Sequence, residues 1–376
     1  MKNKKVIEIK SLSEYIKYIT DNNLKNFISR GENSKFENII ASAFRYSKPL
    51  NFYESIDEFY NIIGNDITNM QKDNFVAFSQ HHGIPTNLVD FSTSPLVSLF
   101  FSCYGNKNDN KEGYVYFINK MKLINVNEDL IKCNILQMLL DQDPKTTSII
   151  IELYKYVDSH INEILQLLTS FINKLKYNED TREKYNDVFK ISDGLKYDEY
   201  FYDNCRKILH EIIQVNSDDR NVTDFILQED IIVNYIQIIR PLNDLTQYVY
   251  FDIVLLIIVV IKVVLSEFCD LSLLKEKIKE IELPFYFSYY PPNMLSRVSN
   301  QSSLFIYQMY YDDNLQDFYI DANKNRIIQT IVPDYVVKIK NQSEILKDLD
   351  TLGINLKFIY NDYDNIAKYI TNKYDQ

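Results

Sequence analysis

The strongest constraint on the fold is a change in sequence pattern along the chain. Short strand-like and helical segments, separated by turn residues, occur before residue 120 and again after residue 284. Between them, residues 121–283 contain long helical patterns with few turn residues. We therefore predict an α+β fold in which residues 1–120 and 284–376 form one domain with a mixed or antiparallel sheet. Residues 121–283 interrupt this domain as a helical insertion or subdomain.

Periodicity and turn residues predict the individual elements. Strands are expected at 6–9, 27–29, 88–91, 113–119, 304–310, 318–321, 335–339 and 356–360. Helices are expected at 38–46, 55–63, 68–80, 96–104, 342–352 and 363–374, and within the insertion at 148–176 and 200–215. A further helix begins after Ser11 or Ser13, which can cap it. Pro95 suits the first turn of the helix at 96–104, and Gly353 suits the end of the helix at 342–352.

Composition excludes several classes of protein. The net charge of −11 argues against a protein that binds nucleic acid through bulk positive charge. The four cysteines are scattered singly, so neither a disulfide framework nor a cysteine metal site is expected. The basic N-terminus is not followed by an apolar core and does not read as a signal peptide. We therefore expect a cytosolic protein with reduced thiols.

One apolar run tests that expectation. Residues 253–261 are nine consecutive aliphatic residues, bounded by Asp252 and Lys262. A membrane span needs about 20 largely apolar residues, so this run predicts a buried element instead of a span. The alternative is a membrane-proximal or oligomer-forming helix, and the sequence leaves the oligomeric state open.

The segment 80–94, QHHGIPTNLVDFSTS, carries the densest chemistry in the chain. It holds two of the four histidines, His81 and His82, beside one of only seven glycines, Gly83. A turn through Pro85 leads to a short apolar run that ends at Asp90. Binding groups usually lie on loops that a rigid scaffold positions, so this segment is the first candidate for a functional site.

Further motifs occur on both sides of this segment. Phe27-Ile28-Ser29-Arg30-Gly31 and Ile40-Ala41-Ser42-Ala43-Phe44-Arg45 precede it, and Arg297 and Gln301-Ser302-Ser303-Leu304-Phe305 follow it. Leu352-Gly353-Ile354 and Asp362-Tyr363-Asp364-Asn365-Ile366-Ala367 come near the end. Together these motifs resemble the FRG domain family over residues 5–120 and 284–372. The chain departs from the family pattern at Ser29, where an aromatic residue is usual, at Asn87, where arginine is common, and at Ser303, where glycine is usual.

A second, more distant resemblance concerns mechanism. ADP-ribosyltransferases of the Arg-Ser-Glu class carry an Arg-Gly-type motif, then a Ser-Thr-Ser strand, then a Gln/Glu-x-Glu motif. The order here is Arg30-Gly31, Ser92-Thr93-Ser94 and Gln301-Ser302-Ser303, so the decisive glutamate is missing. This resemblance implies NAD as the cofactor and either ADP-ribose transfer or NAD cleavage as the activity.

The resemblances and the side-chain chemistry assign candidate roles. The candidate catalytic residues are His82, Asp90 and Gln301, and the candidate cofactor-binding residues are Arg30, Gly31, His81, Ser92, Thr93, Ser94 and Arg297. A guanidinium binds phosphate in a bidentate way, so Arg30 would hold the pyrophosphate, while His82 would orient ribose or act as an acid or base near pH 7. No metal is expected.

Structural roles compete with each of these assignments. Arg30 can instead form a buried ion pair, for instance with Asp90, and a carboxylate that enters a core needs such a partner. At a helix end His81 and His82 point in different directions, so at most one should face a pocket. Thr93 and Ser94 can simply cap the next helix. Glutamine cannot act as a general base, which weakens catalysis through Gln301.

The family resemblance implies a bacterial or phage cytosolic effector of the phage-defence or toxin type, with a nucleotide pocket. The alternative is a non-catalytic module that binds a nucleotide or a partner, or a set of motifs that only form a structural polar network. The helical insertion is the expected surface for a protein partner, and no membrane span is expected. If the pocket exists, Arg30, His82 and Arg297 should converge in one cleft.

Overall fold

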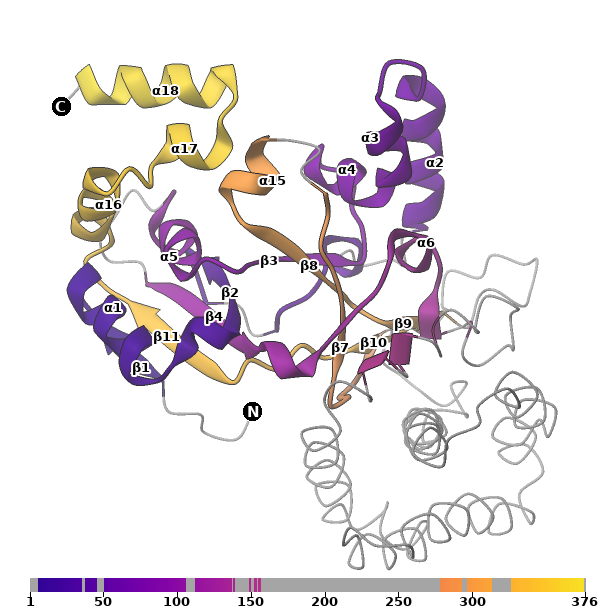
Figure 1. Ribbon diagram of the computed structural model, residues 1–376, viewed down its shortest axis with the longest axis horizontal. Helices are drawn as coiled ribbons and strands as arrows, with labels where there is room; N and C mark the ends of the chain where they lie inside the picture. Colours follow the sequence, from indigo (N-terminus) through magenta and orange to yellow (C-terminus); the bar gives the residue numbers. More distant parts are fainter. Residues whose placement is uncertain are drawn as a thin grey trace, which may run out of the picture. The chain divides into compact units, whose positions relative to one another are not determined.

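The computed structural model describes residues 6–35, 38–45, 51–105, 112–136, 138, 149, 152–153, 155–156, 278–292, 296–312 and 326–374 (Figure 1). The chain divides into two compact units. The first contains residues 1–123, 286–308 and 330–376, and the second contains residues 124–285 and 309–329. Both are described separately below, and the candidate site belongs to the first.

An eight-stranded sheet organises the first unit. Its strand order is β1 (Ile7–Ile9), β11 (Tyr335–Ile339), β4 (Gly113–Asn119), β2 (Phe27–Glu32), β3 (Leu88–Ser92), β8 (Ser303–Tyr307), β7 (Tyr286–Tyr289) and β5 (Leu123–Asn125). The β1–β11 pair is parallel, whereas the β11–β4, β4–β2, β2–β3, β3–β8 and β8–β7 pairs are antiparallel. A mixed sheet with helices confirms the predicted α+β class, and strands from both ends of the sequence share it.

Helices from both ends of the chain share one apolar core with this sheet. They are α1 (Leu12–Asp21), α5 (Pro95–Cys103), α16 (Gln342–Thr351) and α17 (Leu356–Tyr360). Tyr15, Leu99, Phe117 and Ile345 are among the core side chains with no exposed surface. Ser11 caps α1 by accepting a hydrogen bond from the Glu14 amide, as the sequence predicted.

The remaining helices of the first unit are α2 (Phe52–Ile63), α3 (Asn69–Asp73), α4 (Phe75–His81), α15 (Ser296–Asn300) and α18 (Tyr363–Tyr374), together with the short 3₁₀ turns η1 (Leu24–Asn26), η2 (Ser42–Phe44) and η3 (Lys120–Lys122). Of these, α4 and α15 line the candidate site. Figure 1 shows α15 between α17 and α4, over the middle of the sheet where β3 and β8 run side by side. These short helices therefore complete the surroundings of β3.

Three predicted elements of the first unit were wrong. The helix expected at 38–46 is only the η2 turn, because Ile39 pairs across to Ile331 as an isolated bridge. The helix expected at 68–80 breaks at Asn74, whose non-helical backbone (φ −107°, ψ 37°) ends α3 and precedes α4. The strand expected at 356–360 is the helix α17, because the Asn355 side chain accepts from the Phe358 amide and caps it.

The second unit contains a three-stranded sheet among its described residues. Strand β10 (Arg326–Gln329) lies between β6 (Ile278–Ile281), which is parallel to it, and β9 (Tyr310–Asp312), which is antiparallel. The short helix α6 (Glu128–Ile131) also belongs here. The predicted helix at 200–215, the strand at 318–321, the aliphatic run at 253–261 and nearly all of the helix at 148–176 lie outside the described residues. In the described part of the chain, no helix is both long and apolar enough to span a membrane.

Candidate functional site

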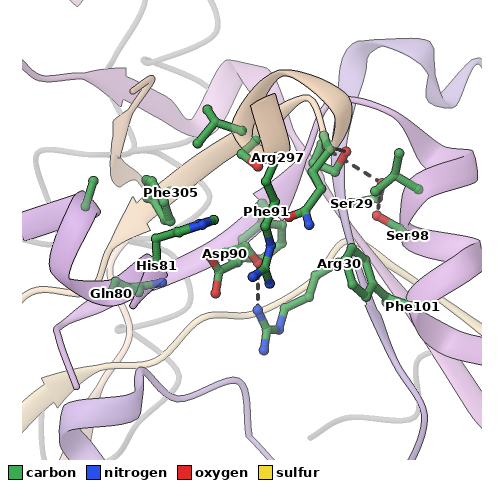
Figure 2. Close-up of a pocket in the computed structure, with 17 residues that line it drawn as sticks. Ser29, Arg30, Gln80, His81, Asp90, Phe91, Ser98, Phe101, Arg297 and Phe305 are labelled. Carbon is green, nitrogen blue, oxygen red and sulfur yellow. Dashed lines mark hydrogen bonds between the residues drawn. The ribbon is translucent and has the colours of Figure 1, made fainter. Parts of the chain in front are cut away.

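A cavity of about 250 Å³ lies in the first unit, where segments distant in sequence meet (Figure 2). Its walls come from β2, α4, β3, α5, α15 and β8. The lining residues on which its chemistry depends are Arg30, His81, Asp90, Ser92, Arg297 and Gln301, and Phe91, Phe101 and Phe305 add aromatic surface. The cavity thus brings Arg30 and Arg297 together from separate motifs, but His82 is absent from its lining, so the expected convergence of all three in one cleft was wrong.

Arg30 is held at the end of β2 by two hydrogen bonds. Its Nε donates to Glu32 Oε1 at 2.6 Å, and one terminal nitrogen donates to the Asp90 main-chain carbonyl at 2.7 Å. Both side chains of the ion pair are largely buried, with 16% of Arg30 and 6% of Glu32 exposed. The buried ion pair that was the structural alternative for Arg30 is therefore present, but its partner is Glu32 and not Asp90.

The sequence reasoning missed Glu32, although a signal was present. Residues two apart in a strand lie on the same face, so a carboxylate two residues after Arg30 is placed to meet it. The second oxygen of Glu32 is buried and has no hydrogen-bond partner among the described residues. Glu32 does not line the cavity, and its contact with Arg30 fixes the direction of the guanidinium.

Arg297 reaches the cavity from α15. Its guanidinium carbon lies 4.5 Å from the centre of the Tyr360 ring, which provides a cation–π contact. No hydrogen bond or ion pair joins its guanidinium to any residue that the structure describes. Figure 2 shows Arg30 and Arg297 approaching the cavity from opposite sides. A cation without a carboxylate partner in a partly buried cavity is suited to bind an anion.

The two histidines at the end of α4 have different surroundings. His81 lines the cavity, whereas His82 does not and packs its ring 4.4 Å from that of Phe78. At most one histidine was expected to face a pocket, and it is His81, whereas the proposed role in orienting ribose had been assigned to His82. Burial, assisted by Arg297 and His82, lowers the pKa of His81 to about 4. His81 is therefore neutral at pH 7 and can donate or accept a hydrogen bond.

Asp90 is the only acidic residue among the described residues that line the cavity. Its side chain is exposed and does not enter the core, so the expectation that it needs a structural ion pair was wrong. Within the described part of the chain, no hydrogen bond or ion pair engages its carboxylate. The site therefore offers a carboxylate that a ligand can reach.

The Ser-Thr-Ser and Gln-Ser-Ser motifs meet, as their order in the sequence suggested. Ser92 Oγ donates to the Gln301 carbonyl at 2.7 Å, and the Thr93 amide donates to the Ser302 carbonyl at 3.0 Å. The Gln301 side-chain nitrogen donates to the Ile359 carbonyl at 3.2 Å. Thr93 and Ser94 lie outside the cavity lining, and Ser94 occupies the N-cap position of α5. Polar groups in this part of the site thus connect β3 to α15 and α17.

Gly31 lines the cavity but serves the packing of α5. A Cβ at this position would lie 1.7 Å from the Ser98 carbonyl oxygen, so only glycine allows β2 to approach the helix this closely. The neighbouring Ser29 is fully buried and its hydroxyl lies 2.8 Å from that of Ser98. Gly31 therefore shapes the wall beneath Arg30.

Comparison with known proteins gives one family match, which covers part of the chain. Residues 25–111 match the family model described as the FRG domain. No curated protein and no solved structure matches the chain. The matched segment contains Arg30, His81, Asp90 and α5, whereas Arg297 and Gln301 lie beyond it.

Proposed function

From the match of residues 25–111 to the FRG domain family, we propose that the cavity binds an NAD-type nucleotide and acts in NAD cleavage or ADP-ribose transfer. In this proposal Arg30 and Arg297 bind the phosphates, and Asp90 is the carboxylate that takes part in chemistry. His81, as a neutral imidazole, contacts a ribose hydroxyl. The corresponding biological role is that of a cytosolic effector of bacterial or phage origin, of the phage-defence or toxin type.

One observation carries the proposal. Two arginines, one from β2 and one from α15, line a single cavity whose only described acidic lining residue is Asp90. The charge of Arg30 is compensated by Glu32, but that of Arg297 is not compensated by any described carboxylate within ion-pair distance. Arginine recognises phosphate by paired hydrogen bonds, so an anion with several phosphate oxygens matches this arrangement.

The reaction assigns a specific task to Asp90. Hydrolysis of NAD breaks the bond between ribose C1′ and the nicotinamide nitrogen, joins the oxygen of water to C1′ and yields ADP-ribose, nicotinamide and a proton. The bonding pair leaves with nicotinamide, and the Asp90 carboxylate accepts the proton from the attacking water. In ADP-ribose transfer, a nucleophilic group of an acceptor takes the place of water.

Binding without turnover is the second candidate, and Gln301 favours it. Neither Gln301 nor Ser303, at the two ends of the Gln-Ser-Ser segment, is the glutamate of the transferase pattern, and the Gln301 side-chain nitrogen donates to the Ile359 carbonyl. An amide cannot accept a proton as a carboxylate does, so position 301 supplies no acid–base chemistry. If Asp90 does not replace it, the cavity binds a nucleotide and leaves it intact.

The two candidates are separated by measuring NAD binding by calorimetry and nicotinamide release by mass spectrometry. Arg297→Ala should weaken NAD binding at least about tenfold, because a charged hydrogen bond contributes about 1.5–3 kcal/mol. Lys347→Ala, at an exposed position of α16, is the matched control and should bind as the wild type does. Asp90→Asn should retain binding and lose nicotinamide release.

The outcomes discriminate clearly. NAD binding without nicotinamide release by the wild-type protein supports the second candidate and excludes the enzyme. If the wild type does not bind NAD, or if Arg297→Ala binds it as tightly as the wild type, the proposed nucleotide pocket is wrong.

A further inference from the structure

A second cavity of about 200 Å³ adjoins the first one. The two share three lining residues, Arg30, Gln80 and Asp90. The rest of the second cavity is lined by a different set, which consists of Ile40, Ala41, Ser42, Arg45, Gly83, Ile84, Leu88 and Val89. The shared residues therefore form a boundary with one cavity on each side, and Arg30 and Asp90 are accessible from both.

The walls of the second cavity are firmly attached to the sheet. The Ala41 amide donates to Gln308 Oε1 at 2.8 Å, and the Ala43 amide donates to the Thr86 carbonyl at 3.0 Å. The Thr86 amide in turn donates to Ser42 Oγ at 3.1 Å. These bonds join the segment before η2 to the turn after α4, so the two sides of the second cavity hold each other in place.

The chemistry of the second cavity differs from that of the first. Its walls are aliphatic, provided by Ile40, Ile84 and Leu88, and Arg45 is its charged group besides the shared Arg30 and Asp90. Arg45 Nε donates to the Ile40 carbonyl at 2.9 Å, which orients the guanidinium. Burial, together with the nearby Arg30, lowers the pKa of Arg45. Two arginines, Arg30 and Arg45, therefore act on the same boundary beside the carboxylates of Glu32 and Asp90, and both guanidinium groups can contact an anionic group there.

We propose that the second cavity is a subsite for the AMP half of a dinucleotide, which places the other half in the first cavity and the phosphates at Arg30. This inference rests on the proposed function and specifies how the ligand is divided. Each cavity alone is smaller than the range of about 300–1,000 Å³ that is typical of small-molecule sites. A two-part ligand that crosses the shared boundary uses both.

The assignment of the two halves follows from the lining. The first cavity contains His81 and the aromatic side chains of Phe101 and Phe305, which suit the nicotinamide ring and its ribose. The second offers aliphatic surface for adenosine and Arg45 for its phosphate. Asp90, at the boundary, then lies beside the ribose of the reacting half.

The test uses NAD, AMP and nicotinamide mononucleotide as probes, with AMP and the mononucleotide measured by displacement of NAD from the full chain. Arg45→Ala should weaken AMP and NAD about tenfold, in line with the loss of one charged hydrogen bond, and leave the mononucleotide unchanged. Ile84→Phe, which fills the second cavity, should show the same selectivity. Phe101→Ala, in the first cavity, should weaken the mononucleotide and leave AMP unchanged.

Each result supports or overturns the subsite. The subsite is overturned if AMP does not displace NAD from the wild type, or if Arg45→Ala affects AMP and the mononucleotide equally. It is also overturned if Arg45→Ala and Ile84→Phe both bind NAD with the affinity of the wild type while Arg297→Ala binds NAD more weakly. That last pattern leaves the proposed function intact, whereas NAD binding that is insensitive to Arg297→Ala refutes the function itself.

Discussion

The Arg30–Glu32 pair allows a quantitative test of how the site is built. Glu32→Ala removes the carboxylate that accepts from Arg30 Nε at 2.6 Å and leaves the guanidinium largely buried, with only its bond to the Asp90 carbonyl. Losing one partner of a buried ion pair costs about 3–5 kcal/mol, because the remaining charge has lost its compensation. Since Arg30 keeps one hydrogen bond, we expect a value near the lower limit, about 3 kcal/mol.

The measurement is urea unfolding followed by tyrosine fluorescence, which suits a chain with 30 tyrosines and no tryptophan. Amide hydrogen exchange in β2 would localise the loss to the first unit. Glu58→Ala, an exposed glutamate in α2, is the control and should change the unfolding free energy by less than about 0.5 kcal/mol. Glu32→Gln removes the charge but keeps an acceptor, so its effect should be intermediate.

The double variant Arg30→Leu with Glu32→Leu gives the most stringent check. Apolar replacement of both partners leaves no buried charge uncompensated, so the double variant should lose less stability than the sum of the two single variants. Glu32→Ala that is as stable as Glu58→Ala, or a double variant whose loss equals that sum, would refute the conclusion that Glu32 holds Arg30 in place.

Three further predictions concern single positions. Gly31→Ala should lower the unfolding free energy by more than about 3 kcal/mol, because its Cβ would lie 1.7 Å from the Ser98 carbonyl, whereas Gly83→Ala, with a φ of +93° but open space around it, should cost only about 1 kcal/mol. The pKa of His81 is lowered from 6.5 to about 4, so the unfolded chain takes up the proton first as the pH drops. The unfolding free energy should therefore fall between pH 6.5 and pH 4. His81→Gln should flatten this slope in unfolding curves measured across the same range. Asn87→Leu should raise the unfolding free energy by about 1 kcal/mol, because neither amide atom of this fully buried side chain bonds to a described residue; a loss measured in urea would contradict this.

Local signals in the sequence predicted most elements of the first unit. Helix α1 begins where Ser11 caps it, and α16 is followed by Gly353 with a φ of +83°, as the sequence indicated. The error at 356–360 arose because a short apolar run fits a strand and a helix equally well. The capping bond from Asn355 decides for the helix. At Ile39 the decisive contact is with Ile331, and no local pattern reveals a pairing between segments this far apart.

The sequence predicted several residues that line the cavity, but it did not predict which way their side chains point. The motif order grouped Arg30, Ser92 and Arg297 correctly, because β2, β3 and β8 are neighbours and Ser92 pairs with both Ser29 and Ser303. Which histidine faces the cavity depends on the residue at which α4 ends. A shift of this end by one residue would change which of the two histidines faces the cavity. The role of Glu32 was readable from strand alternation, since residues two apart share a face.

The departures from the family pattern also acquire a physical meaning. Ser29 replaces the usual aromatic residue, and it is fully buried with its hydroxyl 2.8 Å from that of Ser98 in α5. Asn87 replaces the common arginine and lines neither cavity. The positive charge that lines the two cavities therefore comes from Arg30, Arg45 and Arg297 in this chain.

The division of these charges has a consequence for the FRG segment itself. The family match ends at residue 111, yet Arg297 and Phe305 line the first cavity and Tyr360 supports Arg297 by a cation–π contact. Strand β8 pairs directly with β3, so the C-terminal part completes the wall that contains Asp90. The matched residues alone would keep Arg30 and its buried partner Glu32 but would lack Arg297, which forms no ion pair with any described carboxylate, although Asp362 interacts with it electrostatically at longer range. The proposed anion site therefore draws on both ends of the chain, because Arg297 and Tyr360 lie outside the recognised segment.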